Sequence, residues 1–189
     1  MVVIRGCPYF CTFWDQAGTG ARRRSPQKVM EEIKQCVNEF GIKEISFWDD
    51  TMSYHKKWMV EFLNLLIDAK LDLCWSCYAA VNTVDKEILQ LMSKAGCWNI
   101  FYGFETAVDE LAKNILTNRK NTNLERMKQV AKWSREAGIE IRGSFMVGMP
   151  GETKGTIIES AKFIASLRFV LGLNWNVEEP SFWAMPVPG

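Results

Sequence analysis

The stretch from Thr83 to Thr106, TVDKEILQLMSKAGCWNIFYGFET, contains one helix followed by one strand. Thr83 is a favourable N-cap residue, and Gly96 is typical of a helix end. Apolar residues at helical spacing predict one buried helix face, formed by Ile88, Leu91, Met92 and Ala95. Residues 97–102 are rich in apolar and aromatic side chains and predict a buried strand, which ends at Glu105. A helix that leads into a buried strand is the repeat unit of an α/β fold.

The same alternation of strand and helix extends along the chain in both directions. Five further strands are predicted, at residues 2–5, 44–48, 71–78, 139–147 and 173–177. Strands that alternate with helices favour right-handed crossovers and a parallel sheet. Six units in 189 residues give 189/6 ≈ 31 residues each, whereas eight units need about 250 residues. The predicted fold class is α/β, a partial (β/α)6 TIM-like barrel with parallel strands, open and truncated after the sixth strand.

Length and composition favour a single domain over residues 1–189. The hydrophobic fraction of 48% suits one core, and a net charge of +1 gives no electrostatic case for nucleic acid. No apolar run approaches the roughly 18 residues of a membrane span. The apolar stretch at the N-terminus is too short for a signal peptide, so we expect a cytoplasmic protein. No helix follows the sixth strand, which leads us to expect a fragment of a longer protein.

The first predicted strand runs into a loop that carries two cysteines, RGCPYFCTFW at residues 5–14. The chain has six cysteines and is neither small nor evidently secreted, so metal or redox chemistry is favoured over disulfides. Cys7 and Cys11 are separated by three residues on a loop that leaves a buried strand. Two thiolates in that arrangement can hold one metal centre.

The loop resembles the cluster-binding loop of the radical S-adenosylmethionine (radical SAM) family, which runs Cys-x-x-x-Cys-x-aromatic-Cys. Cys7, Cys11 and the aromatic Phe13 match this pattern, and Trp14 stands where the family has its third cysteine. Four later segments resemble successive strands of the subgroup fused to cobalamin-binding domains, namely residues 47–50, 75–77, 102–106 and 143–153. The resemblance covers essentially the whole chain in order and spacing.

The resemblance implies a radical enzyme. Cys7 and Cys11 would be ligands of a 4Fe-4S cluster whose open iron binds S-adenosylmethionine, and cleavage of that cofactor would give a 5′-deoxyadenosyl radical that abstracts hydrogen. The implied reaction is methyl transfer or rearrangement. The implied partners are a small-molecule substrate, a cobalamin-binding domain upstream and an electron donor such as a flavodoxin or ferredoxin.

Cofactor-binding residues also follow from the resemblance, at positions on or after the predicted strands. Ligands of parallel α/β sheets bind at the carboxyl ends of the strands. The residues implied are Phe13, Asp50, Glu105, Arg142, Ser144, Val147, Gly148 and Pro150.

Trp14 leaves several interpretations open, because an indole offers an N–H donor and no lone pair for a metal. The chain could be an inactive barrel that has lost the cluster and acts as a binding or structural module. The tryptophan could be a sequence change, since Cys and Trp codons differ by one base, or Cys77 could complete the site. A structural zinc site from Cys7, Cys11, Cys74 and Cys77 is a further alternative. It is disfavoured because strand residues three apart point to opposite faces.

Overall fold

The computed structural model describes residues 1–115 and 123–171. Its centre is a four-stranded parallel sheet of order β3-β4-β5-β6, with strands β3 (Glu44–Phe47), β4 (Cys74–Ala79), β5 (Cys97–Glu105) and β6 (Glu140–Phe145). The helices are α1 (Pro26–Phe40), α2 (Lys56–Ala69), α3 (Lys86–Lys94), α4 (Asp109–Ile115), α5 (Leu124–Glu136) and α6 (Lys154–Leu171), with a short 3-10 helix η1 (Met52–Tyr54). The alternation of parallel strands and helices confirms the predicted α/β class.

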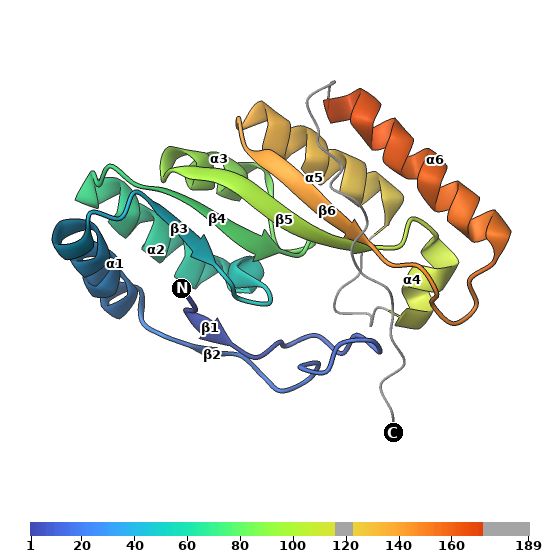
Figure 1. Ribbon diagram of the computed structural model, residues 1–189, viewed down its shortest axis with the longest axis horizontal. Helices are drawn as coiled ribbons and strands as arrows, with labels where there is room; N and C mark the ends of the chain where they lie inside the picture. The colour runs from blue at the N-terminus through green and yellow to red at the C-terminus, as the bar shows by residue number, and fades with distance from the viewer. Residues whose placement is uncertain (116–122, 172–189) are drawn as a thin grey trace.

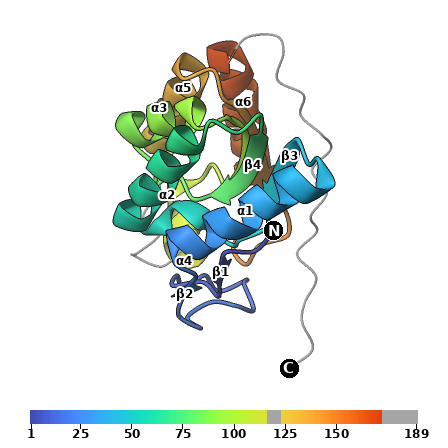
Figure 2. The same ribbon diagram turned by 90° about the vertical axis from the view of Figure 1, so that its left-hand side faces the viewer.

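Helices α2, α3, α5 and α6 lie on one side of the sheet (Figures 1 and 2). Side chains that point to this side are buried in one core, which includes Phe47, Trp75 and Tyr102, each at most 1% exposed. Phe47 packs edge-on against Phe62 of α2 at 5.8 Å and against Trp75 at 5.7 Å between ring centroids. Strand residues alternate between the two faces, so the residues between these face away from the helices. We call that second side the open face.

The first predicted strand does not belong to the parallel sheet. Residues Ile4–Arg5 form β1, which pairs antiparallel with β2 (Arg22–Arg23). The intervening loop turns back on itself because Gly6 and Gly20 both have positive φ. A Cβ at Gly6 would collide with the carbonyl oxygen of Gly20, so this close approach requires glycine. The expected strand at residues 2–5 is confirmed over Ile4–Arg5, whereas its expected parallel pairing is wrong.

The N-terminal segment nevertheless lies at the β3 edge of the sheet. The Met1 amino group donates to the Ser46 carbonyl oxygen at 2.7 Å, and the Trp48 N–H donates to the Met1 carbonyl oxygen at 2.9 Å. This pair of bonds continues the parallel ladder by one residue. The sixth predicted strand, residues 173–177, lies outside the described residues. Within 1–115 and 123–171, no helix is long and apolar enough to cross a membrane.

Local hydrogen bonds determine where helices α1 and α3 begin. Ser25 caps α1 and Pro26 occupies its first turn, as the sequence predicts. The cap of α3 is Asp85 rather than Thr83, and its Oδ1 accepts from the Ile88 N–H at 2.9 Å. The Thr83 hydroxyl instead donates to the Ala80 carbonyl oxygen at 2.7 Å. A hydroxyl that closes a turn of its own is not free to cap the helix that follows.

Truncation of Phe62 tests the core. Phe62 is fully buried and also stacks on Trp58 at 5.2 Å. We expect Phe62→Ala to lower the free energy of unfolding by about 3–5 kcal/mol, because it leaves a cavity at the centre of the core. The matched control Phe40→Ala removes a ring that is 70% exposed at the end of α1, and should cost less than about 0.5 kcal/mol. Urea unfolding followed by circular dichroism measures both, and equal losses would contradict the assignment of the core.

Candidate functional site

The cysteine loop packs against the carboxyl-terminal edge of the sheet. Cys7 and Cys11 are buried, 5% and 6% exposed, in a small apolar cluster of their own. The cluster also contains Ala80 after β4, Met149 after β6 and residues of α4. The loop is tied to α4 by the Thr12 N–H, which donates to the Ile115 carbonyl oxygen at 3.0 Å. Residues from four separate segments thus meet around the two thiols, at the edge where parallel α/β sheets bind ligands.

Phe13 belongs to the same neighbourhood. It is half-buried and packs against the cluster together with Met146, which follows β6. The structure therefore brings together three of the residues that the sequence singled out, Cys7, Cys11 and Phe13.

The other two candidate thiols lie elsewhere. Cys77 is 2% exposed on the helix side of β4, in the main core. It is in hydrogen-bond contact with the Cys97 thiol, and burial raises the pKa of Cys97 well above its usual value. Cys74 lies at the opposite end of β4, with its Sγ 3.5 Å from the Lys43 carbonyl oxygen. Neither is placed to join Cys7 and Cys11 at one metal.

Trp14 occupies the third position of the motif and makes a contact of its own. Its ring is 43% exposed, and its indole N–H donates to the carboxylate of Asp50. Burial and the nearby charge of Asp15 raise the pKa of Asp50, while the bond from Trp14 opposes the rise. The indole thus links the loop to the segment that follows β3. It supplies a donor at a position where a metal centre needs a thiolate.

These residues do not fit a cluster held by three cysteines. Cys7 and Cys11 provide two thiols, and Trp14 cannot provide the third. In the part of the chain that the structure describes, no group of three or more His, Cys, Asp or Glu side chains is placed to hold a metal. The family's three-cysteine set is one ligand short in this loop.

The side chains of Asp49 and Asp50 point in different directions and have different roles. Asp49 is 1% exposed, and its Oδ1 accepts from the Val3 N–H at 2.8 Å and from the Ile4 N–H. Its Oδ2 is buried and has no hydrogen-bond partner among the described residues. Burial raises the pKa of Asp49, and the two backbone bonds only partly offset this. Asp49 anchors the segment before the cysteine loop, a role that the sequence did not indicate.

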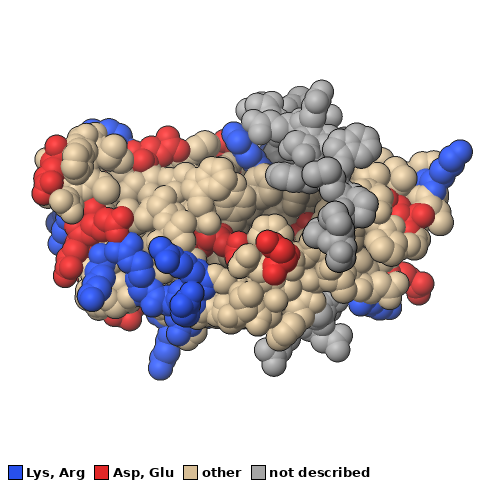
Figure 3. Space-filling model, turned by 60° about the horizontal axis from the view of Figure 1, so that its bottom comes forward, with Lys and Arg blue, Asp and Glu red and all other residues tan. Residues whose placement is uncertain are grey.

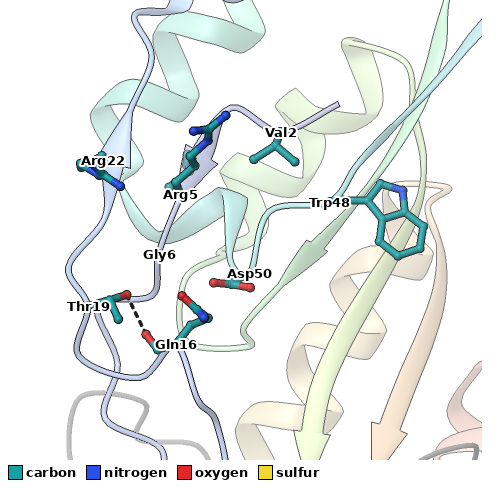
Figure 4. Close-up of a pocket in the computed structure, with 9 residues that line it drawn as sticks. Val2, Arg5, Gly6, Gln16, Thr19, Arg22, Trp48 and Asp50 are labelled. Carbon is teal, nitrogen blue, oxygen red and sulfur yellow. Dashed lines mark hydrogen bonds between the residues drawn. The ribbon is translucent and has the colours of Figure 1, made fainter.

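Asp50 lines an open pocket of about 520 Å³ between β1, β2 and the end of β3 (Figure 4). Arg5 and Arg22 stand on one side of it and Trp48 on another. In the same pocket the Thr19 hydroxyl donates to the Gln16 carbonyl oxygen at 2.8 Å, which holds the loop in shape. Lys and Arg side chains gather at this end of the molecule (Figure 3). The pocket therefore offers cationic, anionic and aromatic groups together.

The remaining predicted residues lie on β5 and β6 or in the segment after β6. Glu105 is 7% exposed and has positive φ, at a β-bulge where its carbonyl oxygen accepts from the Met146 N–H at 2.7 Å. Arg142 and Ser144 are half-buried on β6. Val147, Gly148 and Pro150 lie in the exposed segment after β6. From this part of the chain, the cluster around the cysteines contains Met149, with Met146 packed against it, and not the predicted residues.

The family follows from a direct comparison. The model of the Radical SAM superfamily matches residues 1–164, and this chain belongs to that superfamily. Among curated proteins, an anaerobic magnesium-protoporphyrin IX monomethyl ester cyclase of Cereibacter sphaeroides is 32% identical over 184 residues, which are 94% of this chain and 29% of that protein. An uncharacterized methyltransferase of Pyrococcus horikoshii is 31% identical over 170 residues, 88% of this chain and 36% of that protein.

Solved structures of other proteins share the fold of this chain. The radical SAM methyltransferase TsrM of Kitasatospora setae, solved with cobalamin and a [4Fe-4S] cluster, superposes with a TM-score of 0.81 at 22% identity, over 88% of this chain and 34% of that one. The relatives named here are enzymes, methyltransferases and a cyclase. The chain spans about a third of their length.

Replacement of Asp49 tests the anchor. Asp49→Ala leaves two buried N–H groups without an acceptor, and we expect a loss of about 2–4 kcal/mol in the free energy of unfolding at pH 7. Asp49→Asn keeps a carbonyl acceptor and should lose less than half as much. Thermal unfolding with hydrogen exchange at residues 3 and 4 measures both, and equal losses in the two variants would rule out the proposed hydrogen bonds.

The pH dependence of stability gives an independent check on Asp49. Because its pKa in the folded chain is raised above the ordinary value of 3.8, the folded state binds this proton more tightly than the unfolded state. Relative to Asp49→Asn, the wild-type chain should be most stable below pH 3.8. Its relative stability should fall as the pH rises through the raised pKa. Urea unfolding of both proteins between pH 3 and 7 measures the difference, and the opposite slope would show that the anchor carboxylate is favoured as an anion.

Proposed function

We propose that this chain is the barrel core of a cobalamin-linked radical SAM enzyme that modifies a small-molecule substrate by methyl transfer or a related rearrangement. The observation that carries the proposal is the position of the loop around Cys7 and Cys11, buried against the ends of β4 and β6 and against α4. Family membership and the named activities of the relatives support it.

Within this proposal, the residues at the carboxyl-terminal edge bind the cofactor. Phe13 and the segment 147–150 flank the nucleoside of S-adenosylmethionine, and Ser144 lies beside them. Asp50, Glu105 and Arg142 contact polar groups of the cofactor. A cobalamin-binding domain and an electron donor such as a flavodoxin or ferredoxin are the proposed partners, in the cytoplasm.

A second candidate is a barrel without a cluster, which acts as a binding module. The specific observation in its favour is the bond from the Trp14 indole to Asp50, at the position where the third thiolate should be. Because the described residues lack a third ligand, we assign no radical step to the loop as it stands. The two candidates share the fold and differ in one side chain.

Anaerobic reconstitution with iron and sulfide separates the two candidates. The first candidate predicts about four iron atoms per chain, with the visible absorption of an iron–sulfur cluster, in the wild-type chain as well as in Trp14→Cys, whereas the second predicts them in Trp14→Cys alone. Trp14→Phe is the matched control, since it removes the bond to Asp50 without adding a thiol and should bind no more iron than the wild type. Metal analysis and absorption spectra measure the outcome.

The outcomes decide between the candidates and the zinc alternative. If the wild-type chain binds iron and, once reduced, cleaves S-adenosylmethionine to 5′-deoxyadenosine and methionine, the first candidate holds. If only Trp14→Cys does so, the second candidate holds and the loop is a cofactor loop with one ligand missing. If Trp14→Cys binds no iron, the loop is not a cluster site and the enzyme proposal fails. Stoichiometric zinc in the wild-type chain, lost in Cys7→Ser, would favour a structural zinc site.

A further inference from the structure

The ribbon formed by β1 and β2 carries three arginines, and a fourth follows it. Arg23 donates to the Tyr54 hydroxyl at 2.6 Å, and its guanidinium lies 5.4 Å from the centre of the Tyr54 ring. Arg24 pairs with a carboxylate of α1 at 2.5 Å. In contrast, the exposed side chains of Arg5 and Arg22 make no hydrogen bond or ion pair with another residue in the described ranges. The ribbon therefore holds two positive charges that have no partner within 1–115 and 123–171.

These two arginines lie directly opposite each other. In the antiparallel ladder Arg5 is in register with Arg22, and Ile4 is in register with Arg23. Because neighbouring residues of a strand point to opposite faces, Arg5 and Arg22 share one face, while Ile4 is buried in the core on the other. Directly opposite side chains have Cβ atoms about 5 Å apart, and like charges in that position are destabilising. A negative charge bound between the two guanidinium groups would remove that repulsion.

The face that carries the two arginines borders a pocket. Arg5 and Arg22 form one wall of the open pocket of about 520 Å³, together with Thr19 and Gln16 of the cysteine loop (Figure 4). Further Lys and Arg side chains gather at this end of the molecule (Figure 3). Since a water molecule takes about 30 Å³ in the liquid, the pocket has room for an oxyanion and for an organic group attached to it.

The loop between the two strands holds this wall in place. Gly6 follows β1 directly and approaches Gly20 so closely that a Cβ on it would collide with the Gly20 carbonyl oxygen. The Cys7 N–H donates to the Thr19 hydroxyl at 3.3 Å, and that hydroxyl donates to the Gln16 carbonyl oxygen at 2.8 Å. These contacts fix the two strands relative to each other without a ligand. A site that is organised in advance loses less conformational freedom when a ligand binds.

One carboxylate in the pocket limits where an anion can lie. Asp50 lines the pocket as well, and it accepts from the Trp14 indole rather than pairing with either arginine. Its negative charge repels an anion, so we place the anion against the wall formed by Arg5 and Arg22. Two cations and one carboxylate line the pocket, so its charge remains positive.

We infer that Arg5 and Arg22 form a binding site for a phosphate group, either the free ion or a phosphate monoester of a small molecule. Each guanidinium presents a planar fork of N–H donors that matches phosphate oxygens, and charge-assisted bonds of this kind are stronger than neutral ones. The inference goes beyond the proposed function, because neither arginine belongs to the proposed cofactor residues. The site needs no iron and no cofactor, so it is present in the chain as it stands.

Calorimetric titration of inorganic phosphate into the unreconstituted wild-type chain, at constant ionic strength, tests the site. We expect saturable binding of a single phosphate per chain. Arg22→Gln should weaken this binding about tenfold, and Arg22→Lys, which keeps the charge but not the fork, should weaken it less. Arg23→Gln is the matched control, because it removes the same charge from the next position of β2, on the other face of the ribbon. It should change the affinity by less than about twofold.

Thermal unfolding provides a second readout. Without phosphate, Arg22→Gln should raise the midpoint of unfolding, because it removes the repulsion between opposite arginines. Phosphate should raise the midpoint of the wild-type chain more than that of the variant, since only the wild-type site is complete. A lower midpoint for Arg22→Gln without phosphate would show that Arg22 has a structural role, which contradicts the inference. Asp50→Asn should tighten phosphate binding, because it removes a like charge from the pocket.

Phenyl phosphate distinguishes the two sources of the phosphate group. Binding tighter than that of inorganic phosphate supports a monoester as the ligand, and binding that is no tighter supports the free ion. Equal losses in Arg22→Gln and Arg23→Gln, with both variants folded by circular dichroism, would overturn the site. Displacement of phosphate by an equal concentration of S-adenosylmethionine would also overturn it, because the arginines would then bind the cofactor. None of these results depends on iron binding by Trp14→Cys, so failure of this inference and failure of the proposed function are distinguishable.

Discussion

The two hydrogen bonds from the Val3 and Ile4 amides to the buried carboxylate of Asp49 hold the site in place. They fasten the segment before the cysteine loop to the end of β3. From there the chain reaches Cys7 within three residues and turns at Gly6. The bonds of Met1 at the β3 edge, the apolar cluster around the cysteines and the backbone bond to α4 hold the same region from other sides. A buried carboxylate is costly, and here its cost is partly offset by two backbone donors.

The neighbouring bond between Trp14 and Asp50 fastens the other end of the loop to the same place. Adjacent residues at a strand end point in opposite directions, which lets Asp49 face the core and Asp50 face the pocket. One pair of carboxylates therefore connects to both sides of the cysteine loop. In this chain, the position of the third thiolate has become a structural contact, so a change at Trp14 alters loop attachment as well as ligand supply.

The sequence was sufficient to predict those parts of the fold that depend on local pattern. The strands at Glu44–Phe47 and Glu140–Phe145, the cap at Ser25 and the position of Cys7 and Cys11 on a loop after the first strand follow from alternation, capping chemistry and motif order. The cap at Asp85 and the antiparallel pairing of β1 did not follow. Both depend on contacts made in three dimensions, a turn closed by Thr83 in one case and a glycine loop that folds back in the other.

The two faces of the sheet carry different kinds of side chains. The helix side is filled with apolar residues that any member of the fold needs, and periodicity predicts it. The open face carries Trp48, Tyr78, Phe101 and Arg142, whose positions follow from strand register, which the sequence does not specify. Trp14 lies in the cysteine loop, whereas these open-face side chains belong to β4, β5, β6 and the residue after β3. A change at Trp14 therefore alters the ligand supply of the cysteine loop without changing the side chains on the open face, because different segments of the chain carry the two.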